Sequence, residues 1–168
     1  MLTGSLGGIG LATAQWLASH QDNTSLLLVG RSHALEAGLE YEWGVLQQSC
    51  ANVHCVVADV SKAVDVKGLA SIVGESRLSG VWHAEDVRAD APFAELGMEV
   101  MSQVFAPKVG GAGLLQKYVL QNSLQKYVLF SSAASLFGGD VRDAAHTVAS
   151  ACLDGAASHR VSLGLAGV

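Results

Sequence analysis

The 168-residue sequence has little proline, little charge and no excess of basic residues. Its 2 Pro against 19 Gly, together with 50% hydrophobic residues, are not the composition of a disordered or fibrous chain. The 10 Lys and Arg against 15 Asp and Glu leave a formal net charge of −5. Nucleic acid is therefore not an expected partner, because phosphate binding needs a basic face. The length is typical of one domain.

Cysteine and long apolar runs are also scarce. The 3 Cys form no CxxC pair, which argues against a disulfide framework and predicts a reducing compartment such as the cytoplasm. The 6 His show no metal-ligand spacing with Cys or carboxylates, so no metal site is expected. No apolar run reaches the roughly 18 residues of a membrane span, and no membrane partner is expected either.

Short apolar runs rich in Val and Leu alternate with stretches of helical length. Such runs are typical of strands that are buried on both faces of a parallel sheet. The expected strands are 26–29, 53–58, 80–83 and 126–130, and the expected helices are 8–19, 34–49, 64–75, 95–120 and 144–163. The alternation predicts an α/β fold with a doubly wound parallel sheet, in a single domain that spans 1–168.

One hexapeptide, Leu-Gln-Lys-Tyr-Val-Leu, occurs at 115–120 and again at 124–129. The first copy continues a helical pattern, and the second leads directly into Phe130 and a pair of serines. We therefore expect the same six residues first as helix and then as strand, with tertiary context overriding propensity in one of them. A single duplication does not indicate a solenoid.

A glycine-rich stretch, TGSLGGIG, leads directly into an expected helix near the start of the chain. Glycines let the backbone approach a ligand closely, and the free N–H groups at a helix start attract a pyrophosphate. We expect a dinucleotide phosphate loop, with a tight strand-to-helix turn as the alternative reason for the glycines. The residues expected to contact the cofactor are Thr3, Gly4, Leu6, Gly8, Ile9 and Gly10.

Polar residues follow two of the expected strands. Arg31 and Ser32 follow the strand 26–29, at a position where an acid favours NAD and an Arg favours the 2′-phosphate of NADP. Arg31 therefore predicts NADPH, with a solvated surface Arg as the alternative. Asp59 and Val60 follow the next strand, and Asp59 either binds the adenine amino group or caps the helix that comes after it.

Six motifs together resemble the ketoreductase domain of modular polyketide synthases and animal-type fatty acid synthases, a branch of the short-chain dehydrogenase/reductase superfamily. They are TGSLGGIG, LLLVGRS, VVADVS, GVWHAEDV, FAPKVGGAGLL and YVLFSSAASLFG, and they cover essentially the whole chain. The resemblance implies a Rossmann-like fold, NADPH, and neighbouring synthase domains. It also implies reduction of a β-ketoacyl group that is carried on an acyl carrier protein.

The resemblance assigns roles to four residues. Ser132 matches the serine that hydrogen-bonds the substrate carbonyl, where charge develops as hydride arrives. Lys108 matches the lysine that orients the cofactor ribose. A strand-end cap for Ser132 and a solvated helix charge for Lys108 are the alternatives. Aligning the segment 152–154 with the family's Phe-Leu-Asp puts His146 at the catalytic tyrosine and Ser150 at the catalytic asparagine.

The missing tyrosine puts proton delivery in doubt. One residue has been added between Ser132 and this position, and a register shifted by one would place Ala145 there instead of His146. A phenol stays protonated at pH 7 and is acidic enough to protonate an alkoxide, whereas an imidazole is mostly neutral there. His146 is therefore either a weak general acid or a partly exposed histidine at a helix start in an inactive domain.

Further departures concern the cofactor pocket and the ends of the chain. Glu85 and Asp86 stand where the family has small residues, so two carboxylates are expected to crowd the nucleotide and repel its phosphates. Of the Leu-Asp-Asp signature for product stereochemistry only Asp90 survives.

The ends of the chain also depart from the family. The family's first strand is expected to be missing, which would expose edges on its neighbours. The chain is also expected to stop where the next strand should begin. These ends predict a segment of a longer synthase or a truncated product.

Overall fold

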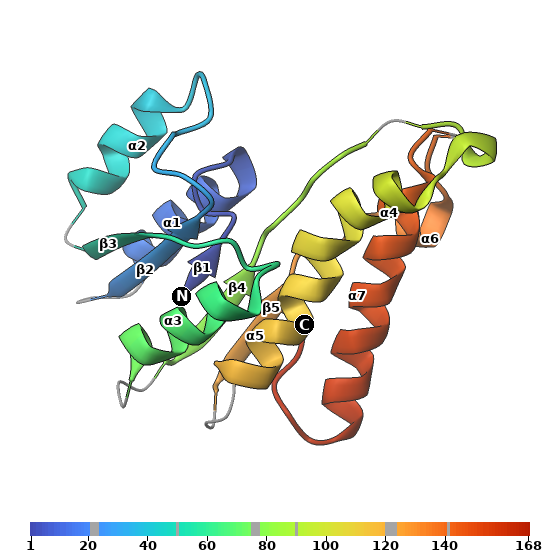
Figure 1. Ribbon diagram of the computed structural model, residues 1–168. Helices are drawn as coiled ribbons and strands as arrows, with labels where there is room; N and C mark the ends of the chain where they lie inside the picture. The colour runs from blue at the N-terminus through green and yellow to red at the C-terminus, as the bar shows by residue number, and fades with distance from the viewer. Residues whose placement is uncertain (21–23, 50, 75–77, 90, 120–123, 141) are drawn as a thin grey trace.

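The computed structural model describes residues 1–20, 24–49, 51–74, 78–89, 91–119, 124–140 and 142–168 (Figure 1). The strands are β1 (Leu2–Thr3), β2 (Ser25–Gly30), β3 (Asn52–Val57), β4 (Gly80–His83) and β5 (Lys126–Leu129). The α-helices are α1 (Gly8–His20), α2 (Glu40–Gln47), α3 (Ala63–Val73), α4 (Met98–Phe105), α5 (Gly111–Tyr118), α6 (Ala134–Phe137) and α7 (Ala144–Ser162). Asp90, the remnant of the stereochemical signature, lies outside these described residues.

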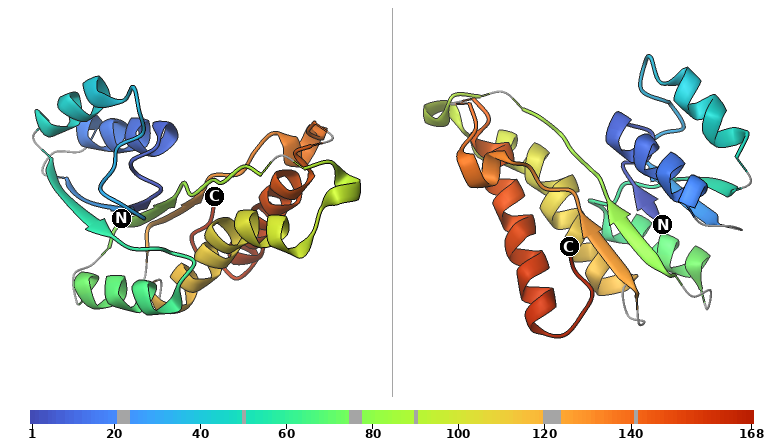
Figure 2. Two further views of the ribbon diagram at one scale, coloured as in Figure 1. Left: turned by 45° about the horizontal axis from the view of Figure 1, so that its top comes forward. Right: turned by 180° about the vertical axis from the view of Figure 1, so that it is seen from behind.

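The strands form one parallel sheet in the order β3-β2-β1-β4-β5. The helices α1 and α2 cover one face of this sheet, and α3, α5 and α7 cover the other (Figures 1 and 2). The predicted doubly wound, Rossmann-like α/β fold is confirmed. The chain order reverses between β1 and β4, and the crevice at such a reversal is where open α/β sheets bind ligands. Among the described helices, none is long and apolar enough to cross a membrane.

Two apolar layers hold the helices onto the sheet. Under α1, Leu11 and Leu17 pack with Leu28 of β2, and all three are at most 2% exposed. On the other face the core joins Val81 of β4 to side chains of α3, α5 and α7, with Leu115 fully buried. Burying one such side chain contributes about 1.5–3 kcal/mol. This double burial explains why the inner strands β2 and β4 appear as apolar runs in the sequence.

The first strand is only two residues long, so it is shortened, as the sequence indicated, rather than wholly missing. Leu2 pairs with Leu28 on one side and with Trp82 on the other, so β1 holds the central position between β2 and β4. At the opposite end of the chain, the Val168 N–H donates to the Tyr127 carbonyl at 2.9 Å, and its own carbonyl accepts from the Leu129 N–H at 2.7 Å. Val168 therefore lies beside β5, where the sequence predicts the next strand.

Two predicted helices have different bounds in the structure. The expected helix 34–49 is only α2, because the backbone before it turns at Gly38, where φ is +89°. The expected helix 95–120 divides into a 3₁₀ turn, α4, a π-helical segment η2 (Ala106–Gly110) and α5. Pro107, which has no backbone N–H, lies at the start of η2. The short helix α6 was not predicted.

The duplicated hexapeptide takes two structures, as predicted. In the described residues its first copy lies at the end of α5, and its second copy forms β5. The tyrosine of the second copy, Tyr127, is 1% exposed and donates its hydroxyl hydrogen to the Ala112 carbonyl at 3.1 Å. Tertiary packing therefore decides the conformation, since the residues are identical.

Replacing Gly10 with alanine is expected to destabilise the protein by about 1–3 kcal/mol. The new Cβ would meet the Gly4 carbonyl oxygen at 2.1 Å and the Ser5 Cα at 2.7 Å, so α1 and the loop would have to separate. Chemical denaturation measures the free energy of unfolding. Gly8→Ala is the matched control, because its Cβ would have nothing within 4 Å. Equal stability of the two variants would contradict the packing argument.

Candidate active site

A cavity of about 590 Å³ opens at the carboxyl ends of β1, β2 and β4. It lies at the reversal of strand order, where the fold predicts a nucleotide. Seven of the residues that the sequence analysis assigned to the cofactor line it: Gly4, Leu6, Gly8, Ile9, Gly10, Arg31 and Ser32. The glycine loop and the residues after β2 are thus brought together as expected.

Three of the expected cofactor residues do not line this cavity. Thr3 is fully buried, and its Oγ1 lies 2.7 Å from His83 Nδ1. Val60 is 1% exposed and belongs to the core. The Asp59 carboxylate accepts hydrogen bonds from the Ser61 backbone N–H at 3.0 Å and the Ser61 hydroxyl at 2.6 Å. Asp59 therefore holds the turn before α3 and makes no cap hydrogen bond to the helix itself, so the predicted helix cap is not seen and the adenine contact stays a prediction.

The phosphate loop can accept a ligand at close range. Gly4 has φ of +67°, and a Cβ there would meet the Ala84 carbonyl oxygen at 2.4 Å. At Gly8 a Cβ would face open space, so the start of α1 is open to the cavity. The cradle of backbone N–H groups therefore fits the pyrophosphate of a dinucleotide.

A carboxylate already binds the start of α1. The Gly8 backbone N–H donates to Glu36 Oε2 at 3.1 Å, and the Glu36 backbone N–H donates to the Leu6 carbonyl at 3.1 Å. The loop between β2 and α2 thus folds back over the glycine loop. The sequence analysis missed Glu36, because nothing in its local pattern shows where that loop lies.

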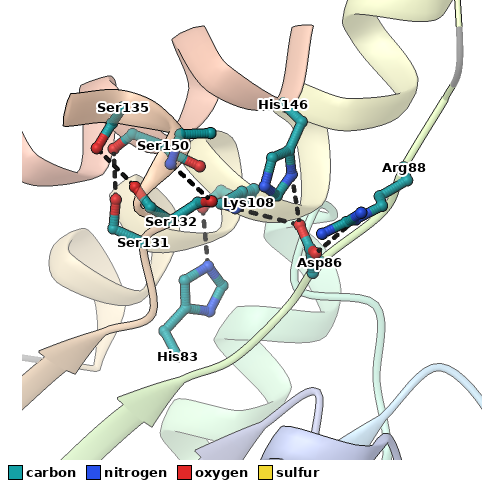
Figure 3. A network of polar contacts seen from close by, with 10 residues as sticks. His83, Asp86, Arg88, Lys108, Ser131, Ser132, Ser135, His146 and Ser150 are labelled. Atoms are coloured by element: carbon teal, nitrogen blue, oxygen red, sulfur yellow. Dashed lines mark hydrogen bonds and ion pairs between the residues drawn. The ribbon is translucent and has the colours of Figure 1, made fainter. Parts of the chain in front are cut away.

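Asp86 is the centre of a polar network at the rim of the cavity (Figure 3). The Lys108 ammonium donates to Asp86 Oδ1 at 3.1 Å, and His146 Nδ1 lies 3.1 Å from the same oxygen without hydrogen-bond geometry. Arg88 Nε lies 3.9 Å from Asp86 Oδ2. The Asp86 carboxylate therefore turns toward the two side chains, Lys108 and His146, to which the resemblance assigns roles.

Lys108 and His146 are both buried, which corrects two of the alternatives raised from the sequence. The Lys108 side chain is 1% exposed, so it is not a solvated helix charge. The His146 side chain is 5% exposed, so it is not a partly exposed residue at a helix start. The π-helical segment carries Lys108 and the first turn of α7 carries His146, and the packing of these segments brings the two side chains to Asp86.

The two serines assigned by resemblance lie beside this network (Figure 3). Ser132 Oγ accepts the Ala134 backbone N–H at 3.2 Å, in the turn that leads into α6. The Ser150 carbonyl accepts from Ser131 Oγ at 3.1 Å. The Ser150 hydroxyl and His146 Nε2 are buried without a hydrogen-bond partner. Unpaired buried polar atoms of this kind call for a ligand or an ordered water.

Comparison with known proteins decides the family. A family model described as KR domain matches residues 1–168. The chain belongs to the KR domain family. Among its relatives in Streptomyces halstedii, polyketide synthase GfsA is 36% identical over 168 residues, and polyketide synthase GfsB is 32% identical over 169 residues. An N-terminal ketoreductase from the macrolactin assembly line superposes with a TM-score of 0.86 at 29% identity.

These similarities cover nearly all of this KR domain and only part of the proteins it matches. The alignments include 98% and 100% of this chain but 2% and 3% of the two synthases. The macrolactin ketoreductase match includes 99% of this chain and 34% of that one. The ketoreductase resemblance and the Rossmann-like fold are therefore confirmed. In the described part of the chain, no group of three or more His, Cys, Asp or Glu could hold a metal ion.

A further histidine of the KR domain is buried behind the polar network. His83 at the end of β4 is fully buried, and its Nε2 lies 2.8 Å from the Lys108 carbonyl. Together with its contact to Thr3, the imidazole joins β1 to the segment that carries Lys108. Burial lowers the pKa of His83 from its ordinary value of 6.5 to about 4. The ring is therefore neutral at pH 7 and positions Lys108 through the backbone.

The stability of the KR domain is expected to fall in mild acid because of His83. Its folded pKa of about 4 lies below the unfolded value of 6.5. The contribution of the neutral His83 ring to the free energy of unfolding is present in full above pH 6.5. It is lost as the pH falls toward 4, and the loss amounts to about 3 kcal/mol. Urea denaturation at several pH values measures this loss. His83→Gln should flatten the profile, and the exposed His54→Gln should not. Identical profiles would exclude His83 as the cause.

Proposed function

We propose that this KR domain reduces the β-keto group of an acyl thioester to a β-hydroxyl group and that His146 makes proton delivery slow. A reduced nicotinamide dinucleotide bound at the glycine loop would supply the hydride to the carbonyl carbon. The carbonyl oxygen must gain one proton, so the net reaction adds one hydride and one proton. The observation that carries the proposal is the convergence of Ser132, Lys108 and His146 beside the cavity (Figure 3).

Each of the three side chains has a separate task in this reaction. The Ser132 hydroxyl donates a hydrogen bond to the carbonyl oxygen, where negative charge develops. The Lys108 ammonium adds positive charge at the same place and orients the ribose of the cofactor. His146 Nε2 has no partner among the described residues, which leaves it free to hold the proton that the oxygen receives. Ser150 replaces the amide of the family's asparagine with a single hydroxyl.

The replacement of tyrosine supports slow proton delivery. A phenol is protonated throughout the physiological range, whereas only the protonated fraction of an imidazole can donate to an alkoxide. The Asp86 carboxylate, 3.1 Å from His146 Nδ1, faces the nitrogen that does not react. A carboxylate at this distance favours an N–H at Nδ1 electrostatically. General acid catalysis by a positioned side chain contributes about 10²–10⁴-fold in rate, and this is the part that we propose is reduced.

The cofactor and the thioester carrier are the finer parts of the proposal. Arg31 lines the cavity after β2 and is the feature that favours NADPH, because an Arg there accommodates a 2′-phosphate. The two curated relatives are polyketide synthases, which supports a β-ketoacyl chain on an acyl carrier protein as the substrate. It also supports neighbouring synthase domains as partners.

A catalytically inactive domain is the second candidate. The observation that favours it is the ion pair between Lys108 and Asp86 at 3.1 Å, because a lysine held by Asp86 is less available to a ribose. In that case the fold would serve the synthase only as a structural part. The two candidates differ in whether a hydride ever reaches a β-keto carbon.

Deuterium transfer tests the proposed reaction directly. The purified protein is incubated with a β-ketoacyl thioester and with NADPH or NADH that carries deuterium at C4 of the reduced nicotinamide. Mass spectrometry of the product should show one deuterium at the β-carbon of a β-hydroxyacyl thioester. Absence of labelled product with either cofactor, in a protein shown by calorimetry to bind that cofactor, would favour the inactive domain.

A further inference from the structure

Glu85 is a buried acid inside the proposed cofactor cavity. Its side chain follows β4, the residue is 6% exposed, and it lines the cavity together with the glycine loop and Arg31. Its Oε1 has no hydrogen-bond partner. A carboxyl group that is nine-tenths buried with one unpartnered oxygen is costly unless a ligand or water completes its hydrogen bonds.

The surroundings of Glu85 place it on the adenosine side of the cavity. Burial raises the pKa of its carboxyl group, while the Arg31 guanidinium and the Gly4 backbone favour the charged form. Gly4 follows β1, which pairs with β4, and Arg31 follows β2, the next strand of the sheet, so Glu85 shares the cavity with the residues that follow these two strands. In dinucleotide folds the residues at the end of β2 contact the adenosine ribose. Glu85 therefore lines the cavity that holds Arg31, on the side of β4.

The charges of the cavity do not favour an additional phosphate. Arg31 is the only cation among the described residues of its lining, whereas Glu36, Glu85 and Asp86 are acidic. Glu36 already accepts the Gly8 N–H at the start of α1. A phosphate monoester such as the 2′-phosphate of NADPH carries a charge of about −1.5 to −2 at pH 7. The Arg31 guanidinium also interacts with the charge of the nearby Glu85, so it is a weak counter-charge for a 2′-phosphate.

We propose that Glu85 determines the cofactor specificity of this site and selects an adenosine ribose with a free 2′-hydroxyl. The unpartnered Oε1 forms a hydrogen bond with that hydroxyl, and the same group crowds and repels a 2′-phosphate. The proposal rests on the proposed function, because it assumes that the cavity holds a nicotinamide dinucleotide. It implies that NADH binds at least as tightly as NADPH, despite Arg31.

Variants of two of the cavity's carboxylates, Glu85 and Glu36, separate cofactor specificity from overall affinity. Glu85→Gln keeps the shape of the side chain and removes its charge. We expect it to shift the ratio of the two dissociation constants at least about tenfold toward NADPH, since like charges at close range are strongly unfavourable. Glu36→Gln is the matched control. Glu36 contacts the phosphate loop, which both cofactors share, so this variant should strengthen both and leave their ratio unchanged.

Isothermal titration calorimetry with NADH and NADPH on the full chain measures these ratios. The proposal is supported if the unaltered protein binds NADH at least as tightly as NADPH and Glu85→Gln reverses the preference. A protein that binds NADPH more than tenfold tighter, with a ratio that Glu85→Gln leaves unchanged, overturns it. If the unaltered protein binds neither cofactor, the proposed function fails. In that case a gain of NADPH binding in Glu85→Gln still supports the role of Glu85, and no gain overturns it.

Discussion

Replacing His146 with tyrosine is expected to raise the rate of β-ketoacyl reduction by about 10²–10⁴-fold, the usual contribution of a well-placed general acid. The position is buried and faces Asp86, beside the Lys108 ammonium. A tyrosine there would bring an acid that remains protonated at pH 7. The gain should appear in single-turnover oxidation of the reduced cofactor, which isolates the chemical step from product release.

The loop before α7 decides how large this gain can be. One residue has been added between Ser132 and His146 relative to the family spacing, and its removal between Gly138 and Ala145 should increase the effect of the tyrosine. His159→Tyr is the control, because His159 lies on the same helix and is exposed. An unchanged rate in the His146→Tyr variant that folds and binds cofactor would show that proton delivery is not the limiting defect.

Replacing Asp86 with glycine, the small residue that the family has there, is expected to destabilise the protein without cofactor by about 3 kcal/mol. The Lys108 ammonium is 1% exposed, and the substitution removes its ion-pair partner at 3.1 Å. Removing one member of a buried ion pair typically costs about 3–5 kcal/mol, and the 42% exposure of Asp86 puts the loss near the lower end. Chemical denaturation in the absence of cofactor measures it.

The same variant should bind cofactor more tightly. With Asp86 absent, Lys108 is free to bind the ribose, and one negative charge leaves the cavity rim. Differential scanning fluorimetry should therefore give a lower melting temperature without dinucleotide and a larger upward shift with it. Arg88→Ala removes a charge that is 64% exposed and lies 3.9 Å from Asp86, so it should change neither value measurably. A cofactor-induced shift no larger than that of the unaltered protein would argue against competition between Asp86 and the ribose.

Most of the sheet could be predicted from the sequence because the inner strands β2 and β4 are largely buried, whereas the edge strand β3 has no buried residue. The strand 26–29 appears as a continuous apolar run for this reason, and the structure extends it by one residue at each end. The glycine loop was equally predictable, since only glycine allows the φ of +67° and the close approach to Ala84 at Gly4. In both cases the local sequence carries the physical constraint.

The polar contacts of the site were not predictable in the same way. Glu85 and Asp86 are adjacent, and the sequence analysis treated them as one acidic pair against the nucleotide. In the structure Glu85 is buried in the cavity, while the Asp86 carboxylate contacts Lys108, which lies in the segment η2. The position of η2 depends on Pro107 and on contacts with α7, which are distant in sequence. Side-chain contacts that depend on tertiary packing cannot be recognised from the local sequence.

Stopped-flow fluorescence of the reduced cofactor tests the central claim most directly. The purified protein is mixed with saturating cofactor and a β-ketoacyl thioester, and the decay of nicotinamide fluorescence is compared with that of His146→Ala. The account predicts a slow decay that requires the thioester and falls to the background rate in the His146→Ala variant. A decay of equal rate in both proteins, or none in a protein with bound cofactor, would contradict the assignment of His146 as the proton donor of a working ketoreductase.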